Sequence, residues 1–134
     1  MTSRVRYLAI ALFVFGMIPA GLEAATAEPR LIAVKFHGDW CGSCKKMGPV
    51  FTDLQNKLDG SPILFVKLDL TNNTTKHQAQ LMAAALGLSK TYHDNLGTGF
   101  ILLIDGKTKQ VAAKLTADMT LKQMAAEIQN RIDS

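Results

Sequence analysis

The two cysteines of the chain are the residues whose type and spacing best suit a chemical reaction. They lie two residues apart in the segment Trp-Cys-Gly-Ser-Cys-Lys, residues 40–45. An apolar run precedes this segment and a helical pattern of apolar residues follows it, so Cys41 is predicted at the N-terminus of a helix. Unpaired backbone N–H groups and the helix dipole favour an anion there. We therefore expect the thiol of Cys41 to ionise more readily than a free thiol.

Cys44 lies one helical turn beyond Cys41, where its sulfur can reach that of Cys41. A thiolate that attacks a disulfide of another molecule forms a mixed disulfide, and a second thiol nearby resolves it. Gly42 and Ser43, between the cysteines, are small and let a partner chain approach. The spacing therefore predicts thiol–disulfide exchange.

Two other interpretations of the cysteine pair stay open on these residues alone. The pair could be an inert structural cross-link, although so short a loop removes little entropy from the unfolded chain. It could also bind a metal ion. Zinc requires four ligands, of which the cysteines supply two, so His37 or His93 would have to complete the site.

Alternating strands and helices must position this motif. Short apolar runs predict strands, and apolar residues at spacings of three and four predict helices. A crossover helix makes the first two strands parallel, and a turn joins the last two as a hairpin. The pattern predicts an α/β domain with a mixed four-stranded sheet flanked by helices. The predicted strands are 31–37, 63–70, 100–104 and 110–115, and the predicted helices are 44–58, 75–86 and one that starts after residue 116 or 118 and ends near 132.

Individual residues set the boundaries of these elements. Pro49, inside the first helix, is predicted to kink it because proline removes a backbone hydrogen bond. Thr75 is predicted to open the second helix with a capping box. Thr116 or Asp118 is expected to cap the last helix. Residues 89–98 are predicted to form a long loop.

Residues 1–27 have the organisation of a secretory signal. Arg4 and Arg6 precede an apolar stretch over 7–18, and residues 25–27, Ala-Thr-Ala, offer a cleavage site between small residues. The stretch of about 12 apolar residues is shorter than the ~20 that a membrane-spanning helix needs. We expect cleavage after residue 27, a mature domain of residues 28–134 and a periplasmic or secreted location. An uncleaved N-terminal membrane anchor is the alternative.

Length and composition exclude several classes of protein. A chain of 134 residues holds one compact domain, and 48% hydrophobic residues are too many for a disordered chain. A single apolar stretch excludes a polytopic membrane protein. The net charge of +4 comes from scattered basic residues, so no nucleic-acid partner is expected.

The motif and its surroundings resemble the thioredoxin superfamily. Trp-Cys-Gly-x-Cys-Lys follows an apolar strand, Pro49 lies eight residues beyond Cys41, and the order of elements agrees over residues 31–132. The resemblance implies the thioredoxin fold and a thiol–disulfide oxidoreductase that acts on protein thiols and disulfides. It also implies that Cys41 is the nucleophile and Cys44 the resolving thiol, with Trp40 beside them. We expect a monomer that needs no cofactor.

Two positions depart from the family pattern. Thioredoxins have a buried aspartate six residues before the first cysteine, which accepts a proton from the resolving thiol. Here that position is Lys35, whose charge would favour a thiolate if it lies near the sulfurs. Thioredoxins also have a cis-proline opposite the motif, at a place that falls on Gly99 here. A cis bond before any other residue costs ~2.5–4 kcal/mol, so we expect a trans peptide or an altered loop.

The predicted site has three groups of residues. The catalytic pair is Cys41 and Cys44, and no metal ligand is assigned. The residues expected to contact substrate are Trp40, Gly42, Ser43, Thr98 and Gly99, and those expected to tune the thiols are Lys35, His37 and Lys45.

Two functions follow from this site. The first is an exported thiol–disulfide oxidoreductase for protein clients, more a reductant than an oxidant because its motif differs from that of thioredoxin by one inner residue. Such a reductant would need an electron donor in the membrane. The alternative is a metal-binding or assembly-factor module that uses the CxxC loop without turnover. The departures at Lys35 and Gly99 keep this alternative open.

Overall fold

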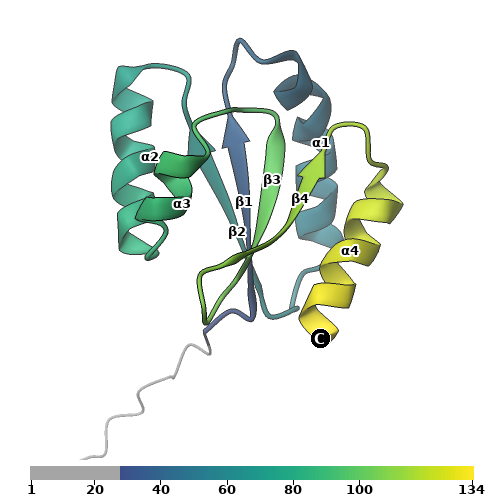
Figure 1. Ribbon diagram of the computed structural model, residues 1–134. Coiled ribbons are helices and arrows are strands. Elements are labelled where there is room, and N and C mark those ends of the chain that lie inside the picture. Colours follow the sequence, from purple (N-terminus) through teal and green to yellow (C-terminus); the bar gives the residue numbers. More distant parts are fainter. Residues whose placement is uncertain (1–27) are drawn as a thin grey trace, which may run out of the picture.

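A computed structural model describes residues 28–134 of the chain. The predicted secretory signal, residues 1–27, lies outside the described residues, so its cleavage stays a prediction. The described part begins just before the first strand and ends with the last helix (Figure 1).

Four strands form one mixed sheet with the order β2-β1-β3-β4. The pair β1–β2 is parallel, whereas β1–β3 and β3–β4 are antiparallel. This arrangement confirms the predicted fold class. The strands are β1 (Leu31–His37), β2 (Ile63–Asp69), β3 (Phe100–Asp105) and β4 (Val111–Thr116), and the helices are α1 (Gly42–Lys57), α2 (Asn73–Ala85), α3 (Ser89–Asp94) and α4 (Leu121–Asp133).

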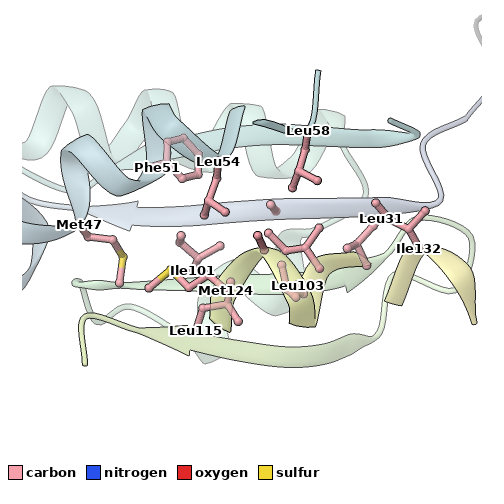
Figure 2. Close-up of a cluster of buried hydrophobic side chains, with 13 residues drawn as sticks. Leu31, Met47, Phe51, Leu54, Leu58, Ile101, Leu103, Leu115, Met124 and Ile132 are labelled. Carbon is pink, nitrogen blue, oxygen red and sulfur yellow. The ribbon is translucent and has the colours of Figure 1, made fainter. Parts of the chain in front are cut away.

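The helices cover both faces of the sheet. In Figure 1, α1 and α4 lie on one face and α2 and α3 on the other. Side chains along β1 point alternately to the two faces, so the strand contributes to two separate apolar clusters. Figure 2 shows the cluster beneath α1 and α4, in which Met47, Phe51 and Leu54 of α1 pack toward the sheet. This packing fixes the position of the first helix relative to β1.

Two predicted helix starts are wrong, each because another residue is the cap. Asn72, not Thr75, caps α2: its side chain accepts a hydrogen bond from Thr75 N, so Thr75 is the third helical residue. Thr120, not Thr116 or Asp118, caps α4. Both caps place a side-chain oxygen where it satisfies a free backbone N–H group.

Residues 89–98 are not a continuous loop, because α3 occupies Ser89–Asp94. Tyr92 anchors this short helix. Its ring is buried in the second apolar cluster, and its hydroxyl donates to the carbonyl oxygen of Lys76 at 3.1 Å. A single buried aromatic residue in a polar stretch has no helical periodicity, which explains why the sequence pattern missed it.

No helix within residues 28–134 is long and apolar enough to cross a membrane.

Pro49 lies inside α1, as the sequence predicted.

Candidate active site

The two cysteines lie at the junction between β1 and α1, at the C-terminal end of β1 (Figure 1). A tight turn makes this junction, in which Cys41 N donates to the carbonyl oxygen of Gly38 at 3.0 Å. A second loop supports it, because the backbone N–H of Asp39 donates to the hydroxyl of Thr71 at 3.1 Å. Thr71 follows β2, the parallel neighbour of β1, so the two loops meet at one edge of the sheet.

Cys41 and Cys44 form a disulfide, with their Cα atoms 5.2 Å apart. Cys41 is the N-cap of α1, and its sulfur accepts a hydrogen bond from the backbone N–H of Cys44 at 3.1 Å. This confirms the placement predicted from the sequence. The free N–H groups at a helix start stabilise negative charge on such a sulfur once the disulfide is reduced.

The two sulfurs have different surroundings. Cys41 is 8% exposed, whereas Cys44 is only 1% exposed. The Sγ atom of Cys44 lies 3.7 Å from the carbonyl oxygen of Phe36, at the end of β1. Another molecule can therefore reach Cys41 more easily than Cys44.

Gly99 brings a second segment against the cysteines. Its φ angle is +85°, and its N–H donates to the carbonyl oxygen of Phe36 at 3.0 Å. A Cβ atom at this position would lie 2.8 Å from Ser43 Cβ and 3.2 Å from Cys41 Sγ. Glycine is therefore the residue that permits both this backbone conformation and this approach. No peptide bond within residues 28–134 is cis, which agrees with the trans peptide expected before Gly99.

The segments 40–43 and 98–99 come together at the surface. Gly42 and Ser43 are exposed, and a Cβ atom on Gly42 would meet no atom within 4 Å. Thr98 is half-buried beside Gly99. The residues expected to contact substrate thus gather around Cys41.

Trp40 is the most exposed of the large apolar side chains in the described residues, at 66%. Its indole ring lies over Gly38, where an added Cβ atom would be 2.9 Å from Trp40 Cε2. Sequence reasoning missed this role of Gly38. A glycine two residues before an exposed tryptophan in a tight turn is the signal that could have indicated it.

Lys35 is the one buried charged side chain among residues 28–134, at 4% exposure. It lies on the face of β1 that packs beneath α1, with its Nζ atom 5.5 Å from the centre of the Phe51 ring. Burial, and secondarily the charge of Lys67, lower the pKa of Lys35 below 10.5. Lys45, in contrast, is exposed on the outer side of α1.

His37 ends β1 and is oriented by an exposed carboxylate. Its Nε2 atom lies 2.9 Å from Asp39 Oδ1, and its Nδ1 atom is buried without a hydrogen-bond partner. His93 is exposed on α3. Within the described part of the chain, no three His, Cys, Asp or Glu side chains gather as a metal site would require.

Comparisons with known proteins agree with this architecture. A family model described as thioredoxin matches residues 22–84. Thioredoxin of Borreliella burgdorferi is 33% identical over 89 residues, which are 66% of each chain. Protein disulfide-isomerase 1 of Caenorhabditis elegans is 40% identical over 52 residues, which are 38% of this chain. The chain belongs to the thioredoxin superfamily.

A solved structure shows the same fold. It is described as thioredoxin-2, a component of the protein secretion machinery of the malaria parasite. It superposes with a TM-score of 0.52 at 20% identity, over 75% of this chain and 82% of that one. The mixed sheet flanked by helices is therefore the thioredoxin fold.

The matches to relatives are partial. The chain spans 11% of the length of the isomerase and 66% of the length of the bacterial thioredoxin. The family model ends within α2, so β3, β4 and α4 lie beyond its match. The match to the family model is thus limited to the part of the domain that carries the cysteine pair.

Proposed function

We propose that this protein is an exported thiol–disulfide oxidoreductase that acts on protein clients, with reduction of client disulfides as its direction. One observation carries the proposal: the Cys41–Cys44 disulfide lies at the start of α1, where Cys41 Sγ already accepts a backbone hydrogen bond. Names of relatives support the same chemistry, since they include thioredoxins and protein disulfide-isomerases.

The exchange would proceed in two steps. In the reduced protein, the thiolate of Cys41 attacks one sulfur of a client disulfide, forms a mixed disulfide and releases the other client sulfur as a thiolate. The thiolate of Cys44 then attacks Cys41 Sγ, which closes the Cys41–Cys44 disulfide and releases the second client thiolate. Two electrons pass to the client, and the released thiolates take up protons. The burial of Cys44 supports this division of roles, because a large client cannot reach it directly.

The surface around Cys41 supports a protein client. The exposed ring of Trp40 offers an apolar contact beside the exposed motif residues Gly42 and Ser43. Thr98 and Gly99 form the opposite side, where Gly99 packs directly against Ser43 and Cys41. His37 and Lys45, at the base and the outer side of the motif, are proposed to tune the thiols.

Export is part of the proposal and rests on the sequence of residues 1–27. We propose that this segment directs the chain to the periplasm or the exterior, is removed after residue 27 and leaves a monomeric domain. A reductant outside the cytoplasm needs a source of electrons, which we assign to a dithiol reductase in the membrane. Alkaline phosphatase fused after residue 27 is expected to be active only if the segment exports it.

Insulin reduction with dithiothreitol as the electron source tests the activity. The mature domain, residues 28–134, should accelerate the precipitation of reduced insulin, and Cys41→Ser should lower the rate to that of dithiothreitol alone. Cys44→Ser should keep the attacking sulfur and accumulate a mixed disulfide with insulin, visible by non-reducing electrophoresis. A wild-type rate equal to that of dithiothreitol alone would contradict the proposal.

A measurement of metal affinity separates this function from the metal-binding alternative. The reduced domain is dialysed against Zn²⁺ and against Cu⁺, with Cys41→Ser as the matched control. Turnover of insulin without tight metal binding supports the oxidoreductase. Tight binding that requires Cys41, together with no turnover, would replace the proposal with the metal-binding module.

A further inference from the structure

Lys35 occupies a place where a charged side chain is costly. Leu31 and Ala33 precede it on the same face of β1 and are buried beneath α1 and α4. Lys35 itself is 4% exposed. A buried ammonium group normally has a carboxylate partner, because desolvation penalises an isolated charge. Within residues 28–134, no carboxylate lies within ion-pair distance of Lys35.

The contacts of the ammonium group place it under the beginning of α1. A Cβ atom on Gly48 would lie 4.0 Å from Lys35 Nζ, an ordinary contact distance, so the ammonium group lies beside Gly48. The ring of Phe51 lies on the next turn, 5.5 Å from Nζ. Gly48 is one helical turn beyond Cys44, and the two residues therefore share a face of α1.

A second contact brings Cys44 to the same strand. The Sγ atom of Cys44 lies 3.7 Å from the carbonyl oxygen of Phe36, the neighbour of Lys35 in β1. Cys44 is 1% exposed and Lys35 is 4% exposed, so both side chains lie in a poorly solvated region. Charges in such a poorly solvated region interact more strongly than charges at the surface.

We propose that Lys35 is a positioning residue of the cysteine pair, whose buried ammonium group stabilises the thiolate form of the reduced pair and makes the Cys41–Cys44 disulfide easier to reduce. The inference rests on the proposed function, since it concerns the redox equilibrium of the same two sulfurs. It gives the unpaired charge a role: the reduced pair supplies the negative partner that the rest of the core lacks. Stabilisation of the reduced form is what makes a disulfide more oxidising.

The charged neighbours of Lys35 are few. Lys67 lies beside it in register on β2, is largely exposed and has Asp69 Oδ2 3.7 Å from its ammonium group. From β3, the neighbour in register is the apolar Ile101. The contacts on α1 are Gly48 and Phe51, neither of which titrates. Burial, and secondarily the charge of Lys67, lower the pKa of Lys35, in agreement with the absence of an ion-pair partner among residues 28–134.

The test compares Lys35→Met with the wild-type domain and with Lys67→Met as the matched control. Two quantities are measured: the pH dependence of thiolate absorbance in the reduced protein, and the equilibrium with reduced and oxidised glutathione. For Lys35→Met we expect the absorbance midpoint to move to higher pH by about one pH unit. We expect the glutathione equilibrium to shift about tenfold toward the Cys41–Cys44 disulfide, which equals about 30 mV for a two-electron couple.

Lys67→Met should change both quantities less than about twofold, because surface charges are screened by solvent. Lys35→Gln, which is neutral but polar, should reproduce the effect of Lys35→Met and keeps the test valid if methionine disturbs the core. Unchanged midpoints and equilibria in folded Lys35→Met and Lys35→Gln would overturn the inference.

Neither measurement requires a client protein. If the wild-type domain fails to reduce insulin but the variants still move the thiolate midpoint, the proposed function fails and the inference stands. If insulin reduction succeeds and the midpoints do not move, only the inference fails.

Discussion

Both α1 and α4 begin with a side chain that accepts a hydrogen bond from the backbone three residues further along. In α4, Thr120 Oγ1 accepts from Gln123 N at 3.2 Å, and Gln123 Oε1 accepts in return from Thr120 N at 2.8 Å. In α1, Cys41 Sγ accepts from Cys44 N at 3.1 Å, and no side chain returns the bond. The start of α4 is a closed capping box, whereas in α1 the N–H of Cys41 donates to the backbone carbonyl oxygen of Gly38 and not to a side chain.

This difference separates stability from reactivity. A reciprocal cap satisfies backbone groups and stabilises the helix without exposing a reactive atom. A sulfur is a weak acceptor in the same position, but it can become an anion that the free N–H groups and the helix dipole stabilise. The same place in two helices therefore serves the fold in one case and, as proposed, electron transfer in the other.

Cys41→Ser and Thr120→Ala should dissociate these two roles, and this pair has the largest expected effect. Serine is a strong N-cap residue, so Cys41→Ser should keep the stability of the reduced domain within about 0.5 kcal/mol while insulin reduction disappears. Thr120→Ala should lower the free energy of unfolding by about 1 kcal/mol and leave the rate of insulin reduction unchanged. Denaturant titration under reducing conditions, together with the insulin assay, measures both. Loss of insulin reduction in Thr120→Ala would contradict the separation.

The second prediction concerns the close approach of Gly99 to the start of α1. Gly99 and Gly60 both have positive φ, at +85° and +78°, but only Gly99 would bring a Cβ atom into collision. Gly60→Ala should lower the free energy of unfolding by about 1–2 kcal/mol, because an L-residue adopts the left-handed backbone conformation unfavourably. Gly99→Ala should cost a further 1–3 kcal/mol or so from overpacking against Ser43 and Cys41.

Gly99→Ala should also slow insulin reduction, because the collision displaces the attacking sulfur or its neighbour. Gly60 lies in the connection between α1 and β2, with no atom within 4 Å of an added Cβ, so Gly60→Ala serves as its control. Equal losses of stability in the two variants, measured by urea denaturation, would contradict this prediction. They would show that Ser43 and Cys41 move enough to accommodate the added methyl group.

Much of the fold could be predicted from the sequence, because four apolar runs and the spacing of Met47, Phe51 and Leu54 determine which residues are buried. The predictions failed where a short polar side chain decides between neighbouring positions. Asn72 and Thr75 can each cap a helix by local chemistry, and in the structure Asn72 is the cap, with its side chain accepting from Thr75 N. The helix at Ser89–Asp94 was missed because it depends on the burial of Tyr92 and not on a repeated pattern.

The candidate site was predictable only in part. Cys41 and Cys44 were identified because their spacing has chemical meaning at a helix start. The contact between Gly99 and Ser43 joins segments far apart in the chain and follows from the register of β1 with β3. The burial of Lys35 could not be inferred from composition, since lysine is usually exposed and the alternation of β1 alone does not reveal what covers it.

The third prediction uses the pH dependence of the free energy of unfolding to compare a lysine buried beneath α1 with a lysine exposed at the surface of the sheet. The pKa of Lys35 is lowered in the folded state, so the unfolded chain binds more protons between that pKa and 10.5. The free energy of unfolding of the wild-type domain should therefore rise as the pH increases through this window. Lys35→Met should remove this rise and should stabilise the domain at neutral pH by on the order of 1 kcal/mol, because an unpaired buried charge is removed.

Thermal unfolding of the oxidised domain at a series of pH values measures this effect without involving the thiols. Lys67→Met is again the control, since its exposed ammonium group should leave the rise in place. A wild-type stability that falls over the same window would contradict the uncompensated burial of Lys35.

The fourth and smallest effect is expected where the loop before α2 supports the loop before α1. Thr71 N donates to Asp69 Oδ1 at 2.9 Å, and the hydroxyl of Thr71 accepts from Asp39 N at 3.1 Å. Burial raises the pKa of Asp69, but the side-chain and backbone hydrogen bonds from Thr71, with the charges of Lys67 and His37, lower it below 3.8 overall.

Because the folded-state pKa of Asp69 is lowered, its ionised form stabilises the domain above pH 3.8, and this contribution is lost as the pH falls through the folded-state value. Asp69→Asn should therefore lower the free energy of unfolding at neutral pH by about 0.5–1 kcal/mol, and the difference from wild type should shrink in acid. Thr71→Val, which removes the hydroxyl that accepts from Asp39 and the side-chain hydrogen bond that lowers the pKa of Asp69, should lower stability by a similar amount, and part of this loss should disappear in acid. If Thr71→Val also slows insulin reduction, the loop before α2 holds the motif in place, and the start of α1 depends on a neighbouring strand as well as on its own cap.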